Sequence, residues 1–339
     1  MSIPARARPG VPPQLHSMST IKVLVIDKPG ATHLKVLDTL PPSVRVVVSN
    51  QAGVLRESAP DTDAILNGIP DGHLLRDILS RAPRLRWVHS LSAGVEKILF
   101  PELVASPVVL TNARGVFKRS LAEFVMGAVL YFAKDFRRLV QSQQAGVWQP
   151  FEMEEAFSKV MGIVGYGETG RACAELARPF GMKILGLHRR PELSQGDPLL
   201  EAVFGPHELH HLLAKSDYIV LAVPATPQTR GLIGKAEFAV MRPSSVLINV
   251  GRGSLVDESA MIAALEEGRL RGAALDVYET EPLPSGHPFY RSENVLLSPH
   301  CADHTPGFAE LDMEFFMQNL QRFLKGKPLG NIVNKDAGY

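Results

Sequence analysis

Short apolar runs alternate with helical patterns along this chain, and this alternation is the strongest feature of its sequence. From Ile21 onward, we predict strands at Ile21–Ile26, Arg45–Val48, Ala64–Leu66, Leu85–His89 and Val108–Thr111. Helical patterns such as His73–Ser80 lie between several of these runs. Strands that alternate with helices predict a parallel sheet with helices on its faces.

A second alternating series follows a longer helical pattern at Ser120–Val140 and a polar, irregular stretch at Gln141–Phe157. We predict its strands at Val160–Val164, Lys183–Leu187, Tyr218–Val223, Ser245–Val250, Ala273–Asp276 and Val295–Leu297. A last helix is predicted over Phe308–Leu324. The fold class is therefore α/β, with two doubly wound parallel sheets.

Length and composition narrow the class of protein. A chain of 339 residues is long enough for two domains, since about 150 residues per domain is typical. Lys and Arg total 36 against 35 Asp and Glu, a balance that argues against a nucleic-acid partner. No run of about 18 uncharged apolar residues is present, which argues against a membrane span. Two cysteines and the lack of an Asn-x-Ser/Thr acceptor favour a cytoplasmic protein over a secreted one.

The first 20 residues differ from the rest. They contain four prolines, Arg6 and Arg8 but no acidic residue, and they lack apolar periodicity. We expect a disordered leader over residues 1–20. A transit peptide is the alternative, because such peptides are rich in arginine and poor in acids.

One glycine motif predicts a nucleotide cofactor. The segment Gly165-Tyr166-Gly167-Glu168-Thr169-Gly170 directly follows the apolar strand Val160–Val164 and opens a helix over Glu168–Arg178. Strand, glycines, helix and next strand lie within about 30 residues, which is the setting a dinucleotide fingerprint requires. In such a motif the first glycine makes a tight turn, the second lets backbone approach the pyrophosphate, and the third lets helix and strand pack closely. The helix N-terminus then attracts the phosphates.

The end of the next strand bears on which cofactor is used. An NAD site normally has an acid there that accepts hydrogen bonds from the ribose, but this chain has His188-Arg189-Arg190. Two arginines suit a 2′-phosphate, so NADP(H) is favoured and NAD(H) remains possible. The alternative is that the arginines stack on adenine or are solvated.

A second motif resembles a zinc site but lies in the wrong setting. The segment His207-Glu208-Leu209-His210-His211 matches H-E-x-x-H, whose outer histidines bind zinc when a helix carries both. Here a short helix begins at Pro206, and its leucines predict a crossover helix on the sheet. We expect no metal site and solvated histidines.

Three residues follow predicted strands of the second series. Arg252 follows Ser245–Val250, Glu281 follows the strand that ends at Asp276, and His300 follows Val295–Leu297. Ligands of open α/β sheets bind outside the carboxyl ends of the strands. A cationic anchor, a titratable histidine and a carboxylate to orient it form a sufficient set for reducing a 2-keto acid.

These motifs together resemble the D-isomer-specific 2-hydroxyacid dehydrogenase family, from about Ile21 to the C-terminus. The matching pieces are Ser92-Ala-Gly-Val95, Thr111-Asn-Ala-Arg-Gly115, Leu121-Ala-Glu123, Gly146-x-Trp148, the glycine motif, Val223-Pro-Ala-Thr-Pro-Gln-Thr-Arg230, Val250-Gly-Arg-Gly253, the Glu281 segment and Ser298-Pro-His300.

The resemblance implies a Rossmann cofactor domain inserted in a flavodoxin-like substrate domain, and a homodimer. Residues 21–120 and 304–339 would form the substrate-binding domain, and residues 121–303 the dinucleotide-binding domain, with a hinge helix at its start.

The resemblance also implies roles for single residues. Arg252 would hold the substrate carboxylate and polarise the keto oxygen, which His300 would protonate as acid/base. Glu281 would orient His300 and favour its imidazolium form. The other implied contacts are Ala93 and Gly94 with the substrate carboxylate, Asp276 with the nicotinamide carboxamide, Val223, Pro224 and Thr229 in the adenosine-side loop, and Val250 and Gly251 beside Arg252 at the cofactor.

The family has members with different activities, and two departures from its usual pattern stand out here. Glu96 occupies a position where aspartate is commoner, and the run Cys301-Ala-Asp-His304 is unusual after the histidine. His304 either reaches the site or begins the last helix, and we favour the second.

The activity that we expect is NADPH-dependent reduction of glyoxylate or hydroxypyruvate. Pyruvate or a bulkier keto acid is an alternative substrate. Glu281 speaks against formate dehydrogenase, which has glutamine in that position. Phosphite- and phosphoglycerate-oxidising relatives are less favoured, the latter because they often carry an added regulatory domain. The alternative from another class is a dinucleotide-sensing corepressor of the same fold, which would need a peptide-binding groove and long tails.

Overall fold

The computed structural model describes residues 20–339, and the leader predicted over residues 1–20 lies almost wholly outside them. The chain divides into two compact units. Unit 1 comprises residues up to Val116 together with Pro306–Tyr339, and unit 2 comprises Phe117–Thr305. The chain therefore passes between the units twice, once before residue 117 and once after residue 305.

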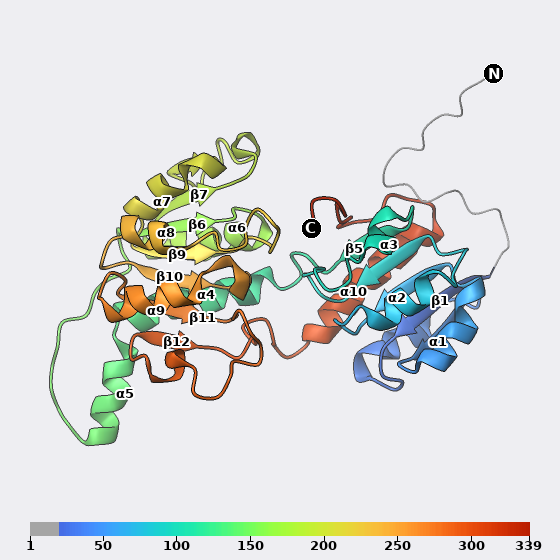
Figure 1. Cartoon of the computed structure of the whole chain (residues 1–339), viewed down its shortest axis with the longest axis horizontal. Helices are drawn as coiled ribbons and strands as arrows, with labels where there is room; N and C mark the ends of the chain where they lie inside the picture. Colours follow the sequence, from blue (N-terminus) through green and yellow to red (C-terminus); the bar gives the residue numbers. More distant parts are fainter. Residues whose placement is uncertain (1–19) are drawn as a thin grey trace. The chain divides into compact units, whose positions relative to one another are not determined.

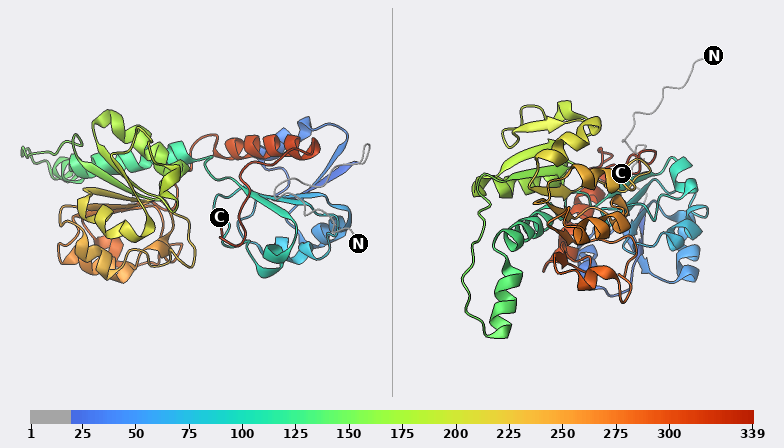
Figure 2. Two further views of the ribbon diagram at one scale, coloured as in Figure 1. Left: turned by 90° about the horizontal axis from the view of Figure 1, so that it is seen from above. Right: turned by 60° about the vertical axis from the view of Figure 1, so that its left-hand side comes forward.

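Unit 1 is built on a parallel sheet of five strands in the order β2-β1-β3-β4-β5. Helix α10 covers one face of this sheet and helices α1 to α3 cover the other (Figures 1 and 2). The strands are β1 Ile21–Ile26, β2 Val44–Ser49, β3 Ala64–Asn67, β4 Trp87–Ser90 and β5 Val109–Asn112. The helices are 3-10 helix η1 Thr32–Thr39, α1 Ala52–Ser58, η2 Ala59–Asp61, α2 His73–Leu79, α3 Pro101–Ala105 and α10 Phe308–Leu324.

Side-chain alternation explains why both faces of this sheet are apolar. Along β1, Val23 and Val25 belong to one buried cluster, with Phe316 of α10. Leu24 and Ile26 belong to the other cluster, which α1 and α2 complete. A strand covered on both faces has a continuous apolar run, as β1 does from Val23 to Ile26.

Unit 2 contains a larger parallel sheet, of seven strands in the order β12-β11-β10-β9-β6-β7-β8. The strands are β6 Val160–Val164, β7 Lys183–Leu187, β8 Ala202–Phe204, β9 Tyr218–Leu221, β10 Val246–Asn249, β11 Gly272–Leu275 and β12 Val295–Leu297. The α-helices are α4 Lys118–Ala133, α5 Phe136–Ala145, α6 Glu168–Ala177, α7 Leu209–Lys215, α8 Lys235–Val240 and α9 Glu258–Glu266. The 3-10 helices are η3 Arg178–Phe180, η4 Pro191–Leu193, η5 Pro206–Glu208, η6 Gly253–Leu255 and η7 Pro288–Arg291.

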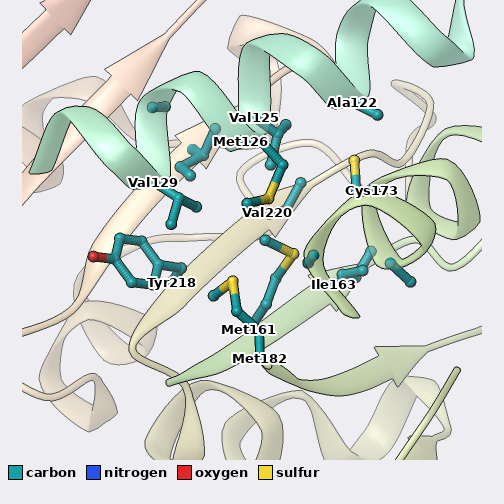
Figure 3. Close-up of a cluster of buried hydrophobic side chains, with 14 of the residues drawn as sticks. Ala122, Val125, Met126, Val129, Met161, Ile163, Cys173, Met182, Tyr218 and Val220 are labelled. Atoms are coloured by element: carbon teal, nitrogen blue, oxygen red, sulfur yellow. The ribbon is translucent and has the colours of Figure 1, made fainter. Parts of the chain in front are cut away.

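Helices α4 and α6 pack on one face of the second sheet. Figure 3 shows this cluster, in which Val125 and Val129 of α4 lie over Ile163 of β6 and Val220 of β9. Cys173 of α6 is fully buried there, and burial raises the pKa of its thiol to about 12. The opposite face is covered by leucines of α7 and by side chains of α8 and α9.

The fold class predicted from the sequence is confirmed, since both units are parallel α/β sheets covered by helices. Two details of the prediction are wrong. The second sheet has a further edge strand, β8, of only three residues, which is too short to show apolar periodicity. The single helix predicted over Ser120–Val140 is two helices, because Asp135 takes a left-handed conformation with φ 48° and accepts a hydrogen bond from the Arg138 amide at the start of α5.

Candidate active site

The glycine motif occupies the turn between β6 and α6. Gly165 has φ +101°, and a side chain there would collide with the backbone of Ala222 after β9. A side chain at Gly170 would lie 2.5 Å from the carbonyl oxygen of Gly165, so the third glycine lets α6 approach the turn. A Cβ at Gly167 would meet nothing within 4 Å, so the backbone there is open toward a ligand at the N-terminus of α6.

These glycines fit a dinucleotide. The turn lies where the strand order reverses between β6 and β9, which is the point where open α/β sheets bind nucleotides. The side chains of the three residues between the glycines differ in burial and in their contacts. Tyr166 is buried and its hydroxyl donates to Asp197 over 3.0 Å, whereas Glu168 is exposed and pairs with Lys118 over 2.6 Å. Thr169 is half-buried in the first turn of α6.

The segment predicted to select the cofactor directly follows β7. Leu187 is the last residue of β7, and its carbonyl oxygen accepts hydrogen bonds from the amides of Gly165 and Tyr166. His188 is half-buried, and Arg189 and Arg190 are exposed. Burial is the main cause that lowers the pKa of His188, and Arg190 adds to it.

The loop after β9 closes on itself through Thr229. The Thr229 hydroxyl donates to the carbonyl oxygen of Pro224 over 2.7 Å and accepts from the Thr226 amide over 2.8 Å. Val223, also half-buried, is the side chain that a Cβ at Gly165 would touch. Of the loop residues predicted from the family resemblance, Val223 thus lies beside the glycine turn. Thr229 holds the loop together through Pro224 and Thr226.

Arg252 is presented by a turn that Asn249 organises. The buried Asn249, the last residue of β10, donates to the carbonyl oxygen of Arg252 over 2.9 Å and accepts from the Gly251 amide over 3.0 Å. The guanidinium of Arg252, half-buried, donates to the Gly251 carbonyl oxygen over 2.7 Å. Val250 and Gly251, which precede Arg252 in the chain, are both buried.

The turn of Arg252 packs tightly against the segment that follows β11. A Cβ on Gly253 would lie 1.8 Å from the carbonyl carbon of Tyr278, so only glycine fits there. The Tyr278 hydroxyl donates toward the carbonyl oxygens of Leu275 and Ser298, at 2.9 and 2.8 Å. The loops after β10, β11 and β12 are therefore held together at the carboxyl edge of the sheet.

Glu281 and His300 form a hydrogen-bonded pair at this edge. His300 Nδ1 lies 2.7 Å from Glu281 Oε2, and the other carboxylate oxygen accepts from the Tyr278 amide over 2.9 Å. An ionised carboxylate can only accept, so Nδ1 donates and Nε2 is left for a reactant. The histidine side chain is 44% exposed, so a small molecule can reach it.

Asp276 fixes the loop that carries His300. Its Oδ1 accepts from the Ser298 hydroxyl over 2.5 Å and from the amides of Cys301 and Ala302 over 2.9 and 3.0 Å. His300 itself has φ 53°, in the left-handed region. A non-glycine residue is held there only where its surroundings over-determine it, and the buried Asp276 provides such a restraint.

His304 lies in the turn after this loop and not in the last helix. Its imidazole is 60% exposed and lies 3.7 Å from the carboxylate of Asp303. Helix α10 begins only at Phe308. The expectation that His304 begins the helix is therefore wrong. Asp303 is half-buried beside it, and burial raises the pKa of that carboxyl.

In unit 1, Ala93 and Gly94 lie in the loop after β4. The side-chain amide of Asn112, at the end of β5, donates to the Ala93 carbonyl oxygen over 2.5 Å and holds this loop. Within residues 20–339, neither the Ala93 nor the Gly94 amide donates to a protein acceptor. Two such amides suit a carboxylate.

The H-E-x-x-H segment has a structural setting. His207 lies in η5 and His211 in α7, both exposed, and His210 pairs with Glu237 over 2.9 Å. Across the described part of the chain, residues 20–339, no three His, Cys, Asp or Glu side chains gather as a metal-binding group. Nor does any helix in that range have the length and apolar character to cross a membrane.

Comparison with known proteins decides the family. The model of the D-isomer specific 2-hydroxyacid dehydrogenase NAD binding domain matches residues 126–302. A glyoxylate reductase of Thermococcus gammatolerans is 34% identical over 293 residues, which cover 84% of this chain and 86% of that protein. The chain belongs to the D-isomer specific 2-hydroxyacid dehydrogenase family.

Solved structures of the family agree with the fold. A D-isomer specific 2-hydroxyacid dehydrogenase of Xanthobacter autotrophicus Py2, in complex with NADPH and MES, superposes with a TM-score of 0.81 at 29% identity, covering 95% of this chain and 100% of that one. An NADPH-dependent glyoxylate/hydroxypyruvate reductase of Sinorhizobium meliloti, in complex with NADP and sulfate, gives 0.80 at 27% identity, covering 94% and 100%. This member of the family is accordingly an oxidoreductase with a nicotinamide-dinucleotide domain.

Three residues of this site were missed by sequence reasoning. Asn249, Tyr278 and Ser298 each act through hydrogen bonds to loop backbone or to Asp276. Their positions at or just beyond strand ends were the available clue, but their partners lie on other loops.

Proposed function

We propose that this chain reduces a small 2-keto acid to the D-2-hydroxy acid with NADPH, and that glyoxylate and hydroxypyruvate are its substrates. The observation that carries the proposal is the hydrogen bond between His300 and Glu281, at the carboxyl edge of the sheet that bears the glycine turn. The names of its relatives support the substrate class, since they include a glyoxylate reductase and a glyoxylate/hydroxypyruvate reductase.

In this reaction His300 is the proton donor. A nicotinamide cofactor, when bound, would supply the hydride for the keto carbon. His300 would donate its Nε2 proton to the keto oxygen, so that the carbonyl becomes a hydroxyl group. Glu281 holds the ring through Nδ1, so that Nε2 keeps one orientation. In the reverse direction the same nitrogen accepts the proton.

Arg252 binds the substrate. A planar guanidinium donates two parallel hydrogen bonds to a carboxylate, and its second edge polarises the keto oxygen. The family resemblance assigns the amides of Ala93 and Gly94, in unit 1, to the carboxylate of the substrate. A guanidinium that holds a carboxylate and polarises the adjacent carbonyl defines a 2-keto acid rather than a simple ketone.

The cofactor is held by the glycine turn and by the loops around it. The amides of Gly165-Tyr166-Gly167-Glu168-Thr169-Gly170 and the N-terminus of α6 take the pyrophosphate. Val223, Pro224 and Thr229 line the adenosine side, and Val250, Gly251 and Asp276 lie toward the nicotinamide. Arg189 and Arg190, with His188, favour a 2′-phosphate, and family members have been solved with NADPH and with NADP.

Helix α5 and the segment after it support a homodimer. No residue of α5 is buried, and its apolar Leu139 and Val140 are 40% and 51% exposed. Trp148 is 96% exposed. Figure 1 shows α5 extending from the body of unit 2. Exposed apolar side chains on a projecting helix, followed by an exposed tryptophan, are typical of an interface. We propose that a second copy of this chain covers them, in the cytoplasm.

The direct test is a substrate panel. The purified chain is mixed with glyoxylate, hydroxypyruvate, pyruvate and a bulkier 2-keto acid, each with NADPH and with NADH, and cofactor absorbance is followed. We expect the highest kcat/KM for glyoxylate or hydroxypyruvate with NADPH. Faster reduction of the bulkier acid would contradict the substrate assignment, and equal or faster use of NADH would contradict the cofactor assignment.

A further inference from the structure

Just after β7, a part-buried hydrogen bond joins His188 to Ser194, a residue to which the proposed function gives no role. His188 directly follows Leu187, whose carbonyl oxygen holds the glycine turn. His188 therefore follows the strand end that adjoins the turn, at the sequence position where an NAD site has its carboxylate. Its Nδ1 lies 3.0 Å from the hydroxyl oxygen of Ser194.

Ser194 reaches His188 because the chain turns back on itself. The 3-10 helix η4 spans Pro191–Leu193, and the Ser194 amide donates to the carbonyl oxygen of Pro191 over 3.0 Å. The carbonyl oxygen of Ser194 accepts from the Asp197 amide over 3.2 Å. The serine is 8% exposed, so its hydroxyl is fixed and largely shielded from water.

The direction of this hydrogen bond follows from what each partner can offer. Burial and then Arg190 lower the pKa of His188, and Arg189 acts the same way, whereas Glu192 and a hydrogen bond with the Arg190 backbone oppose them. The net direction is below the ordinary value of 6.5, which favours the neutral ring near pH 7. A neutral imidazole has one donor and one acceptor nitrogen. If Nδ1 were the donor, the buried Ser194 hydroxyl hydrogen would have no acceptor among residues 20–339, at a cost of about 1–3 kcal/mol. Ser194 therefore donates to Nδ1, and Nε2 carries the hydrogen.

We propose that Ser194 is a positioning residue for cofactor selection: it fixes His188 as the Nε2–H tautomer, so that the end of β7 presents a donor where NAD sites present an acceptor. A phosphate offers acceptor oxygens only, whereas the ribose hydroxyl of NAD needs an acceptor for its own hydrogen. The donor on His188, next to Arg189 and Arg190, thus suits a 2′-phosphate. This inference rests on the proposed NADPH preference.

The first experiment measures binding without turnover. Adenosine 2′,5′-bisphosphate and 5′-AMP are titrated calorimetrically into the full chain, as wild type, Ser194→Ala and Ser194→Thr. One misplaced hydrogen bond weakens binding by about three- to tenfold, so Ser194→Ala should lose that factor for the bisphosphate alone. Ser194→Thr keeps a hydroxyl and should bind as the wild type does.

Two results would overturn the role of Ser194. Wild-type affinity of Ser194→Ala for the bisphosphate is one, and equal weakening of both nucleotides is the other, because the latter indicates a general loosening of the loop. If the wild type binds 5′-AMP as tightly as the bisphosphate, the NADPH preference itself fails, which is a different outcome.

The second experiment observes the tautomer and does not depend on any nucleotide. Long-range ¹H–¹⁵N spectra of histidine-labelled chain report which ring nitrogen carries hydrogen, and His188→Gln identifies the signals that belong to His188. We expect the Nε2–H form in the wild type and a mixture of tautomers in Ser194→Ala. An Nδ1–H form or a charged ring in the wild type at pH 7 would overturn the inference.

Discussion

The two sheets of this chain share a fold class but differ in what their carboxyl edges present. In unit 2, that edge carries a glycine turn and the side chains to which we assign catalysis and substrate binding, Arg252, Glu281 and His300. In unit 1, the loop after β4 offers backbone amides, at Ala93 and Gly94, held by the side chain of Asn112. The difference teaches that a parallel α/β sheet provides a place for a ligand but not a chemistry, which depends on the residues at its edge.

The largest effect is expected from replacing His300, the proton donor proposed at the edge of unit 2. General acid catalysis contributes typically 10²–10⁴-fold, so His300→Gln should lower kcat for glyoxylate reduction by about that factor. Binding of adenosine 2′,5′-bisphosphate should survive, because the glycine turn is untouched. His304→Gln is the matched control in the same loop and should keep its kcat. Near-normal kcat in His300→Gln would remove this residue from the mechanism.

A second test addresses the anchor in unit 2. Arg252→Lys keeps the charge but loses the planar fork, and hydrogen bonds to charged groups contribute about 1.5–3 kcal/mol. We expect kcat/KM for glyoxylate to fall by about ten- to a hundredfold, through a higher KM and a lower kcat. Steady-state kinetics over a range of glyoxylate concentrations measures both. Unchanged constants would mean that the carboxylate is bound elsewhere.

A third test replaces the two arginines after β7, which we assign to the 2′-phosphate of the cofactor. Replacing both Arg189 and Arg190 by alanine should lower kcat/KM for NADPH by about ten- to a hundredfold and leave that for NADH nearly unchanged. The matched control replaces Arg178 and Arg242, two arginines of the same unit that pair with Glu201 and Asp217. A similar loss in the control would show that net charge, and not a local contact, governs NADPH use.

The edge of unit 1 should respond differently. Asn112→Ala removes the hydrogen bond to the Ala93 carbonyl oxygen, worth about 1 kcal/mol, and loosens the loop without touching the proton donor. KM for the keto acid should rise about fivefold while kcat stays within about twofold of wild type. A fall in kcat with unchanged KM would contradict the division of labour between the two edges.

The smallest effect concerns the stability of unit 1. Burial lowers the pKa of His89 from 6.5 to about 3, and its Nδ1 lies 2.7 Å from the Thr111 hydroxyl. As pH falls, the imidazole of His89 is therefore protonated at a higher pH in the unfolded chain than in the folded chain. The contribution of the neutral ring is complete above pH 6.5 and is lost as pH falls toward 3, by about 1.4 kcal/mol per pH unit.

Replacing His89 by asparagine should reduce the loss of unfolding free energy as pH falls below 6.5. Urea unfolding between pH 7 and 4 can be followed through Trp87, which is fully buried in unit 1. Both proteins should carry Trp148→Phe, so that Trp87 is the one tryptophan left. Parallel pH dependence of the two proteins would show that His89 does not carry the effect.

Much of the fold could be predicted because apolar runs mark buried parallel strands. The bounds predicted for β1, β6, β7 and α10 agree with the structure. The break at Asp135 could not be predicted, since it depends on one residue in a left-handed conformation that no periodicity reveals. Strand β8 could not be predicted either, because its three residues are too few to show a pattern and pair only with β7 at the edge of the sheet.

The candidate site also contains residues that could be predicted from the sequence and residues that could not. Residue type and position after a strand were enough to select Arg252, Glu281 and His300, because their chemistry is in their side chains. Asn249 and Tyr278 hold loops by contacting backbone atoms, and such contacts exist only once the strands are side by side. Ala93 and Gly94 were selected only through the family resemblance, because their contribution is backbone N–H.

The central claim is that this chain reduces 2-keto acids to D-2-hydroxy acids, and hydroxypyruvate tests it most directly because its product is chiral. The purified chain is incubated with hydroxypyruvate and NADPH, and the glycerate that forms is separated on a chiral column. We predict D-glycerate in an amount equal to the NADPH consumed. L-glycerate, or no glycerate at all, would contradict the account.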